Sequence, residues 1–250
     1  LKKNQSMNLA RFTFLQSLTL LSFVLPTGLL QAEIELSAVF GDHMVLQRDL
    51  SLPVWGWADP GEEVTITFAG QEKKTKAEKH GYWRTDLDPL NANAKGRVLK
   101  VAGGKGGTLS FKDVLVGEVW ICSGQSNMEW TVNGALNPTE EKESANYPHI
   151  RHIKVPKIPS DSHETTFDSN WEVCSPASAG NFTAVGYFFG RALNEKLGVP
   201  IGLINSSWGG TRIEPWISTE GFHIIEKQKD CMHPVICIGN RPYDKKISSS

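Results

Sequence analysis

The run from Val114 to Ile121 most constrains how this chain can fold. It has the length of a strand, is rich in β-branched and aromatic residues, and stops at the small residues Cys122 to Gly124. This pattern predicts a buried β-strand that ends in a tight turn. In an α/β sheet, catalytic groups and ligands gather where the strands end. The sequence therefore places Ser126 where a nucleophile would stand, between the amide side chains of Gln125 and Asn127.

The turn around Ser126 has two interpretations. Either the hydroxyl of Ser126 attacks a substrate, or Ser126 or Asn127 caps a helix that follows the strand. A short glycine-x-serine turn occurs in many proteins, so this pattern alone favours neither interpretation.

A second strand is predicted to end at the same edge of the sheet. An amphipathic helix opens at Thr183, its apolar residues recur about every 3.6 positions, and Gly198 ends it. Val199–Ile204 then has the pattern of an apolar strand. The order strand, helix, strand predicts a parallel sheet with right-handed crossovers. The turn Trp208-Gly209-Gly210 follows that strand, so we expect it to face the crevice that holds Ser126.

The chain between these two strands has weaker patterns. Glu129–Pro148 is polar and is compatible with a helix that is interrupted at Gly134 and Pro138. Ile150–Val155 is a candidate strand. Pro156–Thr183 is rich in helix breakers and polar residues, so we expect a long loop there.

Residues 33–113 follow a different period. Short alternating runs are separated by turns that contain glycine, aspartate or proline, and this predicts a small antiparallel β-sandwich. We expect strands at Leu36–Phe40, Met44–Gln47, Leu52–Trp57, Val64–Phe68, Tyr82–Asp86, Val98–Val101 and Thr108–Phe111. The neighbours Asp42 and His43 are typical of a solvated turn.

Residues 1–32 have the layout of a secretory signal peptide. Basic residues precede the apolar run Phe12–Leu25, and Pro26, Gly28 and Ala32 follow it. A membrane anchor is the alternative, but the run falls short of about 20 uninterrupted apolar residues. We expect cleavage after Ala32, a periplasmic or secreted protein, and no stable membrane insertion afterwards.

Charge and composition narrow the class of partner. The formal net charge is -1, with acidic and basic residues interspersed, which gives no electrostatic basis for nucleic-acid binding. We expect an uncharged or weakly charged small molecule. Among the eight tryptophans, Trp130, Trp208 and Trp216 lie near the two turns and offer faces for sugar rings, although packing in the core is the commoner role.

The four cysteines form no CxxC pair, and no metal or cofactor is expected. A packed free thiol at Cys122 is the default expectation. A Cys122–Cys174 disulfide is the alternative.

Two motifs resemble those of the sialate O-acetylesterase family, a branch of the SGNH hydrolases. Residues 117–130 read GEVWICSGQSNMEW and residues 199–216 read VPIGLINSSWGGTRIEPW. The first is similar to the family's nucleophile motif, in which Gly-Gln-Ser-Asn takes the place of Gly-Asp-Ser, and the second to its glycine motif. The resemblance covers roughly residues 40–218. It implies a three-layer α/β/α hydrolase domain over 114–218, preceded by the β-rich domain 33–113.

The resemblance also implies a reaction. Members hydrolyse acetyl esters on sugars, so the substrate would be a glycan or small sugar that carries O-acetyl groups. The reaction would pass through an acetyl-Ser126 intermediate, with no cofactor. The backbone N–H of Ser126 and one from Gly209 or Gly210 would hold the oxyanion, while Gln125 and Asn127 would orient Ser126 or add a donor.

Arg212 and the substrate class stay open. Arg212 either binds the carboxylate of a sialic acid through two hydrogen bonds or pairs with Glu214 at the surface. An acetylxylan-type esterase and a catalytically inactive glycan-binding fragment are the alternatives to a sialate O-acetylesterase.

The sequence leaves the catalytic base open. In the family, the histidine sits close after an aspartate near the end of the catalytic domain. Asp230 and His233 have the spacing that hydrolases of this broad class use, but little chain separates them from Trp216. Either His233 is the base, or the chain is an incomplete or frame-disrupted piece of a longer esterase and residues 219–250 are an atypical tail.

Overall fold

The structure is a computed structural model that describes residues 33–160, 163–218 and 221. The predicted signal peptide lies outside the described residues, as do Asp230, His233 and nearly all of the predicted tail. None of the described helices is long and apolar enough to cross a membrane.

The N-terminal part is a β-sandwich, as predicted. One antiparallel sheet contains β1 (Glu35–Leu36), β3 (Leu52–Trp57) and β6 (Tyr82–Leu87). The other contains β4 (Glu63–Phe68), β5 (Gln71–Lys76), β7 (Asn93–Gly103), the first half of β8 (Thr108–Gly124) and, parallel to β8, β2 (Val45–Gln47). Every second residue of β3 and β4 is buried, because successive side chains of a strand point to opposite faces. Val54, Ile66 and Trp83 are among the side chains that form this core.

Two strand predictions in this part were wrong. The expected strand Leu36–Phe40 is only Glu35–Leu36, because the chain turns when the Phe40 N–H donates to Ser37 O. The strand β5 was not predicted, since its sequence QEKKTK has no apolar residue. It forms through backbone pairing with β4 and not through burial of side chains.

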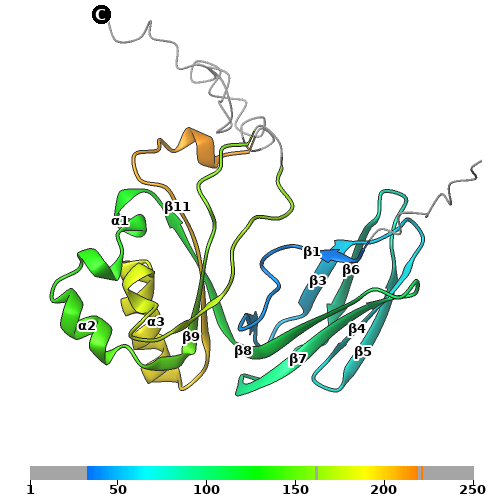
Figure 1. Cartoon of the computed structure of the whole chain (residues 1–250), viewed down its shortest axis with the longest axis horizontal. Coiled ribbons are helices and arrows are strands. Elements are labelled where there is room, and N and C mark those ends of the chain that lie inside the picture. Colours follow the sequence, from blue (N-terminus) through cyan, green and yellow to red (C-terminus); the bar gives the residue numbers. More distant parts are fainter. Residues whose placement is uncertain (1–32, 161–162, 219–220, 222–250) are drawn as a thin grey trace, which may run out of the picture. The chain divides into compact units, whose positions relative to one another are not determined.

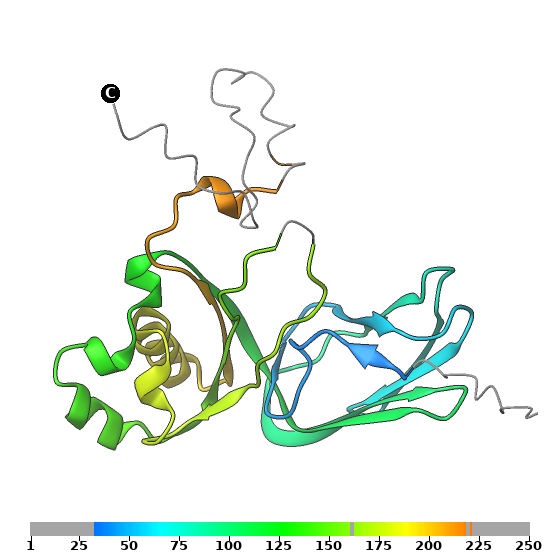
Figure 2. The same cartoon turned by 45° about the horizontal axis from the view of Figure 1, so that its top comes forward.

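The second part has an α/β fold. The second half of β8 pairs in parallel with β11 (Ile201–Ser207), and β11 pairs in parallel with β9 (Tyr147–Lys154). The antiparallel strand β10 (Glu172–Cys174) lies at the outer edge, inside the segment expected to be a loop. The helices are α1 (Ser126–Glu129), α2 (Pro138–Ser144), α3 (Ala184–Leu197) and the short 3-10 helices η1 (Val132–Gly134), η2 (Ala179–Asn181) and η3 (Glu214–Trp216). Figures 1 and 2 show α2 and α3 on one face of this sheet.

The ends of α3 confirm the sequence prediction. The Thr183 hydroxyl accepts the Gly186 N–H at the first turn, and Gly198 ends the helix in the left-handed conformation at φ 66°. Pro138, by contrast, does not interrupt a helix. It occupies the first turn of α2, where its missing N–H costs no hydrogen bond.

The strand β8 belongs to both parts of the chain. The domain boundary expected at 113/114 falls inside it, at a bulge where Asp113 has φ 54°. The Asp113 carboxylate accepts hydrogen bonds from His43 Nδ1 at 2.8 Å and from Arg151 Nη1 at 2.7 Å. Burial would raise the pKa of Asp113, but these two hydrogen bonds outweigh it and the pKa is lowered. The predicted solvated turn at His43 is thus tied to β9.

The predicted Cys122–Cys174 disulfide was wrong, and both thiols are free and buried. Cys122 lies on β8 and Cys174 on β10, with β11 and β9 between them. Adjacent strands are about 4.8 Å apart, so this separation exceeds what a disulfide spans. Burial raises the pKa of Cys122 to about 11 and that of Cys174 to about 12.

Candidate active site

Ser126 stands where the sequence predicts, immediately after the end of a sheet strand. β8 ends at Gly124, which has φ 141°, a conformation that only glycine adopts readily. Gln125 precedes the helix, and Ser126 is the first residue of α1 and is exposed. A hydroxyl in this position is open to a ligand that approaches the edge of the sheet.

The turn that carries Ser126 is anchored to the start of α3. The Ala184 N–H donates to Trp130 O at 2.8 Å, and the Thr183 hydroxyl donates to Met128 O at 2.6 Å. Thr183 is fully buried. One buried hydroxyl therefore caps α3 and fixes α1, which sets the position of Ser126.

Gly209 lies against Ser126, as the parallel-sheet prediction requires. The β11–β8 ladder pairs Ser207 with Gly124 and continues into a bond from the Trp208 N–H to Gly124 O at 2.9 Å. A Cβ atom at position 209 would lie 3.3 Å from Ser126 Oγ. The missing side chain thus leaves the space beside the hydroxyl open.

Side chains hold the turn that contains Gly209. The Thr211 hydroxyl donates to Trp208 O at 2.7 Å, and the Trp216 indole N–H donates to the Thr211 hydroxyl at 2.9 Å. Trp216, which the sequence suggested as a sugar face, therefore has a positioning contact at this turn.

Glu129 and Lys157 are part of the site, although the sequence reasoning did not include them. Glu129 lies one turn of α1 after Ser126, and its carboxylate accepts the Gly209 N–H and forms an ion pair with Lys157. The spacing of three residues from Ser126 was a signal that would have found Glu129. Lys157 follows β9 in a loop, and no local pattern announced it.

A pocket of about 370 Å³ opens at Ser126. Its lining residues are Ser126, Glu129, Trp130, Thr131, Gly134 and Gly209. The Trp130 side chain is 60% exposed, and its indole lies so close to Gly134 that a Cβ atom there would be 2.6 Å from Nε1. An exposed ring beside a nucleophilic hydroxyl offers a flat apolar face for a bound sugar.

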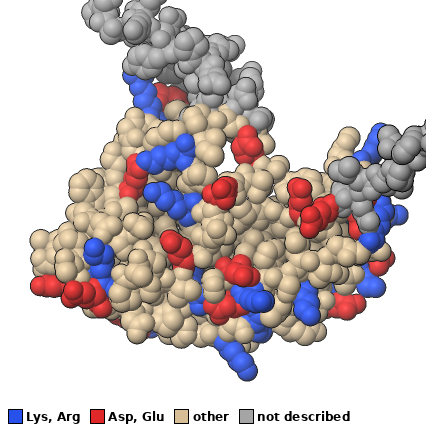
Figure 3. Space-filling model, viewed as in Figure 1, with Lys and Arg blue, Asp and Glu red and all other residues tan. Residues whose placement is uncertain are grey.

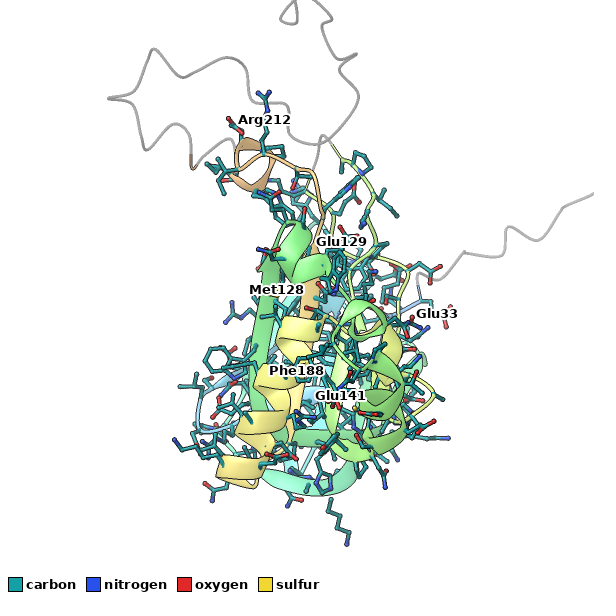
Figure 4. All side chains as sticks on the ribbon, turned by 90° about the vertical axis from the view of Figure 1, so that its left-hand side faces the viewer. Glu33, Met128, Glu129, Glu141, Phe188 and Arg212 are labelled. Atoms are coloured by element: carbon teal, nitrogen blue, oxygen red, sulfur yellow. The ribbon has the colours of Figure 1, made fainter. Side chains whose placement is uncertain are left out.

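Four of the predicted site residues do not line this pocket. Gln125, Asn127, Gly210 and Arg212 are exposed. Figure 4 shows Arg212 well away from Glu129, at the end of the segment that leads out of β11, with its side chain directed outward. The structure therefore brings Ser126 and Gly209 together and leaves these four outside the pocket.

No histidine among the described residues lines the pocket. His152 lies on β9, where its ring stacks on Phe182 with centroids 4.4 Å apart. It is buried, and neither ring nitrogen has a hydrogen-bond partner in the described part. Burial, with a smaller contribution from Lys154, lowers the pKa of His152 to about 3. This ring is an uncharged core residue, and the predicted pair Asp230 and His233 lies outside the described residues.

The comparisons with known proteins agree with this geometry. The family model for carbohydrate esterases, sialic acid-specific acetylesterases, matches residues 116–236. The chain is 40% identical to the sialate O-acetylesterase of Mus musculus over 71% of its own length and 36% of that protein's. It is 36% identical to the sialate O-acetylesterase of Homo sapiens over 86% of its length and 43% of that protein's.

A solved structure shares the fold. A carbohydrate acetylesterase from Xanthomonas citri superimposes with a TM-score of 0.72 at 39% identity, over 78% of this chain and 45% of the other. The chain thus spans less than half the length of these relatives. From these matches, together with the strand-end serine and the glycine turn beside it, we conclude that the chain belongs to the sialate O-acetylesterase family.

Proposed function

We propose that this chain carries the nucleophile and one oxyanion donor of a carbohydrate O-acetylesterase, with O-acetylated sialic acids as the substrate class. Its relatives are named sialate O-acetylesterases and a carbohydrate acetylesterase. Because the chain spans less than half of their length, the activity of the whole protein is part of the proposal.

The closeness of Gly209 to Ser126 carries this proposal. The Gly209 N–H already binds an anionic oxygen, that of the Glu129 carboxylate. That oxygen stands in for the oxyanion of an acetyl ester under attack, so the amide points to a place where negative charge is stabilised. Such a donor typically contributes about 3 kcal/mol in the transition state. The substrate must displace the Glu129 carboxylate, and Lys157 is the partner that holds it aside.

The reaction would be an acyl transfer in two steps. Ser126 Oγ attacks the acetyl carbonyl carbon while a base takes its proton, and the tetrahedral oxyanion is held by the N–H groups of Ser126 and Gly209. Collapse breaks the bond to the sugar oxygen, which receives the proton. Water then attacks acetyl-Ser126, and acetate leaves. The base is either His233, oriented by Asp230, or a residue that this chain does not supply.

The surface around the site fits a small glycan ligand. Figure 3 shows acidic and basic residues interspersed on the face drawn there, without a field of one sign. Trp130 supplies an apolar face, and the Glu129–Lys157 pair supplies a hydrogen-bond acceptor and a donor at the pocket. Sugar rings bind through this combination of an aromatic face and polar groups.

Acetate release tests the function directly. The mature chain is incubated with an O-acetylated sialic acid and with an acetylated xylan fragment, and free acetate is measured. We expect release from the sialic acid, abolished in Ser126→Ala and retained in Ser123→Ala, because Ser123 is an exposed serine of β8 that does not line the pocket. Equal rates in wild type and Ser126→Ala would remove Ser126 as the nucleophile.

The same assay separates the alternatives. Faster release from xylan would support an acetylxylan-type esterase. Binding of the acetylated sugar without any acetate release would support an inactive glycan-binding fragment. Full activity in His233→Ala would show that the base comes from elsewhere.

Export to the periplasm or to the cell exterior is also part of our proposal. It rests on the basic residues, apolar run and small residue of 1–32. Mass spectrometry of the protein recovered outside the cytoplasm would show a mature N-terminus at Glu33, while a retained N-terminus would contradict the proposal.

A further inference from the structure

The second half of β8 has a neighbouring strand on one edge only, within the part of the chain that the structure describes. Residues 118–124 pair with β11. On the sandwich side, β7 pairs with residues 108–116 and β2 with residues 115–117, so both end before Glu118. In Figure 4 the green ribbon that rises into α1 borders the sheet beside the yellow helix α3.

The backbone hydrogen bonds show which groups face the paired edge. The Glu118 N–H donates to Pro200 O, and Gly124 O accepts the Trp208 N–H, each at 2.9 Å. Successive residues of a strand direct their backbone groups to opposite edges. The even-numbered residues from Glu118 to Gly124 therefore face β11.

The odd-numbered residues face the other edge. The Val119 N–H lies on that edge, where the side-chain oxygen Oε1 of Gln47 accepts it at 2.9 Å as β2 ends. Further along, the N–H and C=O groups of Ile121 and Ser123 point to the same side, beyond the last residue of β2. An edge of this kind is a template for another strand.

Exposed apolar side chains flank this open edge on both faces of the sheet. Trp120 is 43% exposed on the face of α3, where its ring meets that of Phe189 with centroids 5.0 Å apart. Val185 of α3 is also exposed, and Ile121, on the opposite face, is 71% exposed. A partner strand that buries this surface needs apolar side chains on both of its own faces.

We propose that Val235–Ile238 of this same chain is that strand and pairs in parallel with the open edge of β8. The run reads Val-Ile-Cys-Ile between Pro234 and Gly239, which is the continuous apolar pattern of a strand buried on both faces. Alternate residues would cover the two faces, with one pair of side chains against Trp120 and the other against Ile121.

The connection is long enough for this arrangement. Residues 208–234 separate the end of β11 from the run. A parallel crossover needs about a dozen residues or more, so the chain can return to the start of β8 and run beside it. The new strand would extend the sheet in the order β11, β8, 235–238.

Amide hydrogen exchange on the full-length chain tests this pairing. The Ile121 and Ser123 amides face the open edge, so we expect them to exchange at least ~10-fold more slowly in the wild type than in Ile236→Lys, which places a charge in the proposed strand. The matched control is Ile247→Lys, in the polar end of the chain, which should retain the slow exchange. The core amides of Val54 and Ile66 report whether each variant is folded, and Ile236→Thr replaces Ile236→Lys if they lose protection.

Two results would overturn the proposal. One is fast exchange of Ile121 and Ser123 in the wild type, or slow exchange that the variant at Ile236 leaves unchanged. The other is slow exchange that weakens on dilution, because the edge would then be covered by a second copy of the chain.

Discussion

A methyl group added at Gly209 would lie 3.3 Å from Ser126 Oγ and 2.6 Å from the Glu129 carboxylate. The two residues are more than eighty positions apart in the sequence, and the parallel pairing of β8 with β11 brings them together. This contact is the clearest reason to regard the end of these strands as a catalytic site.

Gly209→Ala should lower the rate of acetate release more than it lowers stability. Its Cβ atom would meet the end of the flexible Glu129 side chain, which can shift, but it would occupy space that the ester needs. We expect kcat/KM to fall by at least ~10-fold, equivalent to about 1.4 kcal/mol. Gly210→Ala is the control, because nothing lies within 4 Å of its Cβ, although φ 81° adds strain of about 1–2 kcal/mol to the fold. Equal activity in both variants would contradict the assigned role of Gly209.

Thr183→Val should destabilise the protein by about 1–2 kcal/mol. The hydroxyl of Thr183 caps α3 and donates to Met128 O, and valine keeps the shape but leaves both backbone groups without their partner. Urea unfolding gives the free-energy change. Thr139→Val, at an exposed position of α2, should stay within about 0.5 kcal/mol of wild type. A Thr183→Val variant as stable as the wild type would show that this hydroxyl does not anchor α1.

His152→Phe should flatten the loss of stability at acidic pH. Because burial lowers the pKa of His152 from 6.5 to about 3, the unfolded chain binds a proton in this window and the folded chain does not. The contribution of the neutral ring is therefore complete above pH 6.5 and falls by about 1.4 kcal/mol per pH unit down to about 3. Unfolding free energies at several pH values for wild type, His152→Phe and the exposed control His149→Gln measure the difference. The idea fails if His152→Phe retains the full wild-type slope.

Gly117→Ala should disrupt the pairing of β8 with the start of β11. A Cβ atom at position 117 would lie 1.9 Å from the backbone oxygen of Pro200, which cannot move without displacing β11. We expect a loss of about 3 kcal/mol or more. Gly107→Ala is the control, since its nearest atoms lie at 3.7 Å in ordinary contact. Thermal melts of the two variants, run side by side, would refute the prediction if both matched the wild type.

The sequence alone predicted the elements whose signals are local. The apolar run before Ser126, the cap at Thr183 and the glycine at position 198 each act within a few residues, so strand, turn and helix were found where the structure has them. The parallel order of β8 and β11 followed from the sequence strand, helix, strand, and with it the nearness of Ser126 and Gly209.

The tertiary structure decided what depends on partners distant in the sequence. β5 has no apolar residue and exists because β4 pairs with it. β8 crosses the expected domain boundary because β7, β2 and β11 pair with different lengths of it. Glu129 and Lys157 meet at the Gly209 N–H only when the strand ends converge, and no local pattern encodes that meeting. The physical reason is that hydrophobic period and capping are read within one segment, whereas strand pairing and side-chain contacts at a site join segments that the sequence keeps apart.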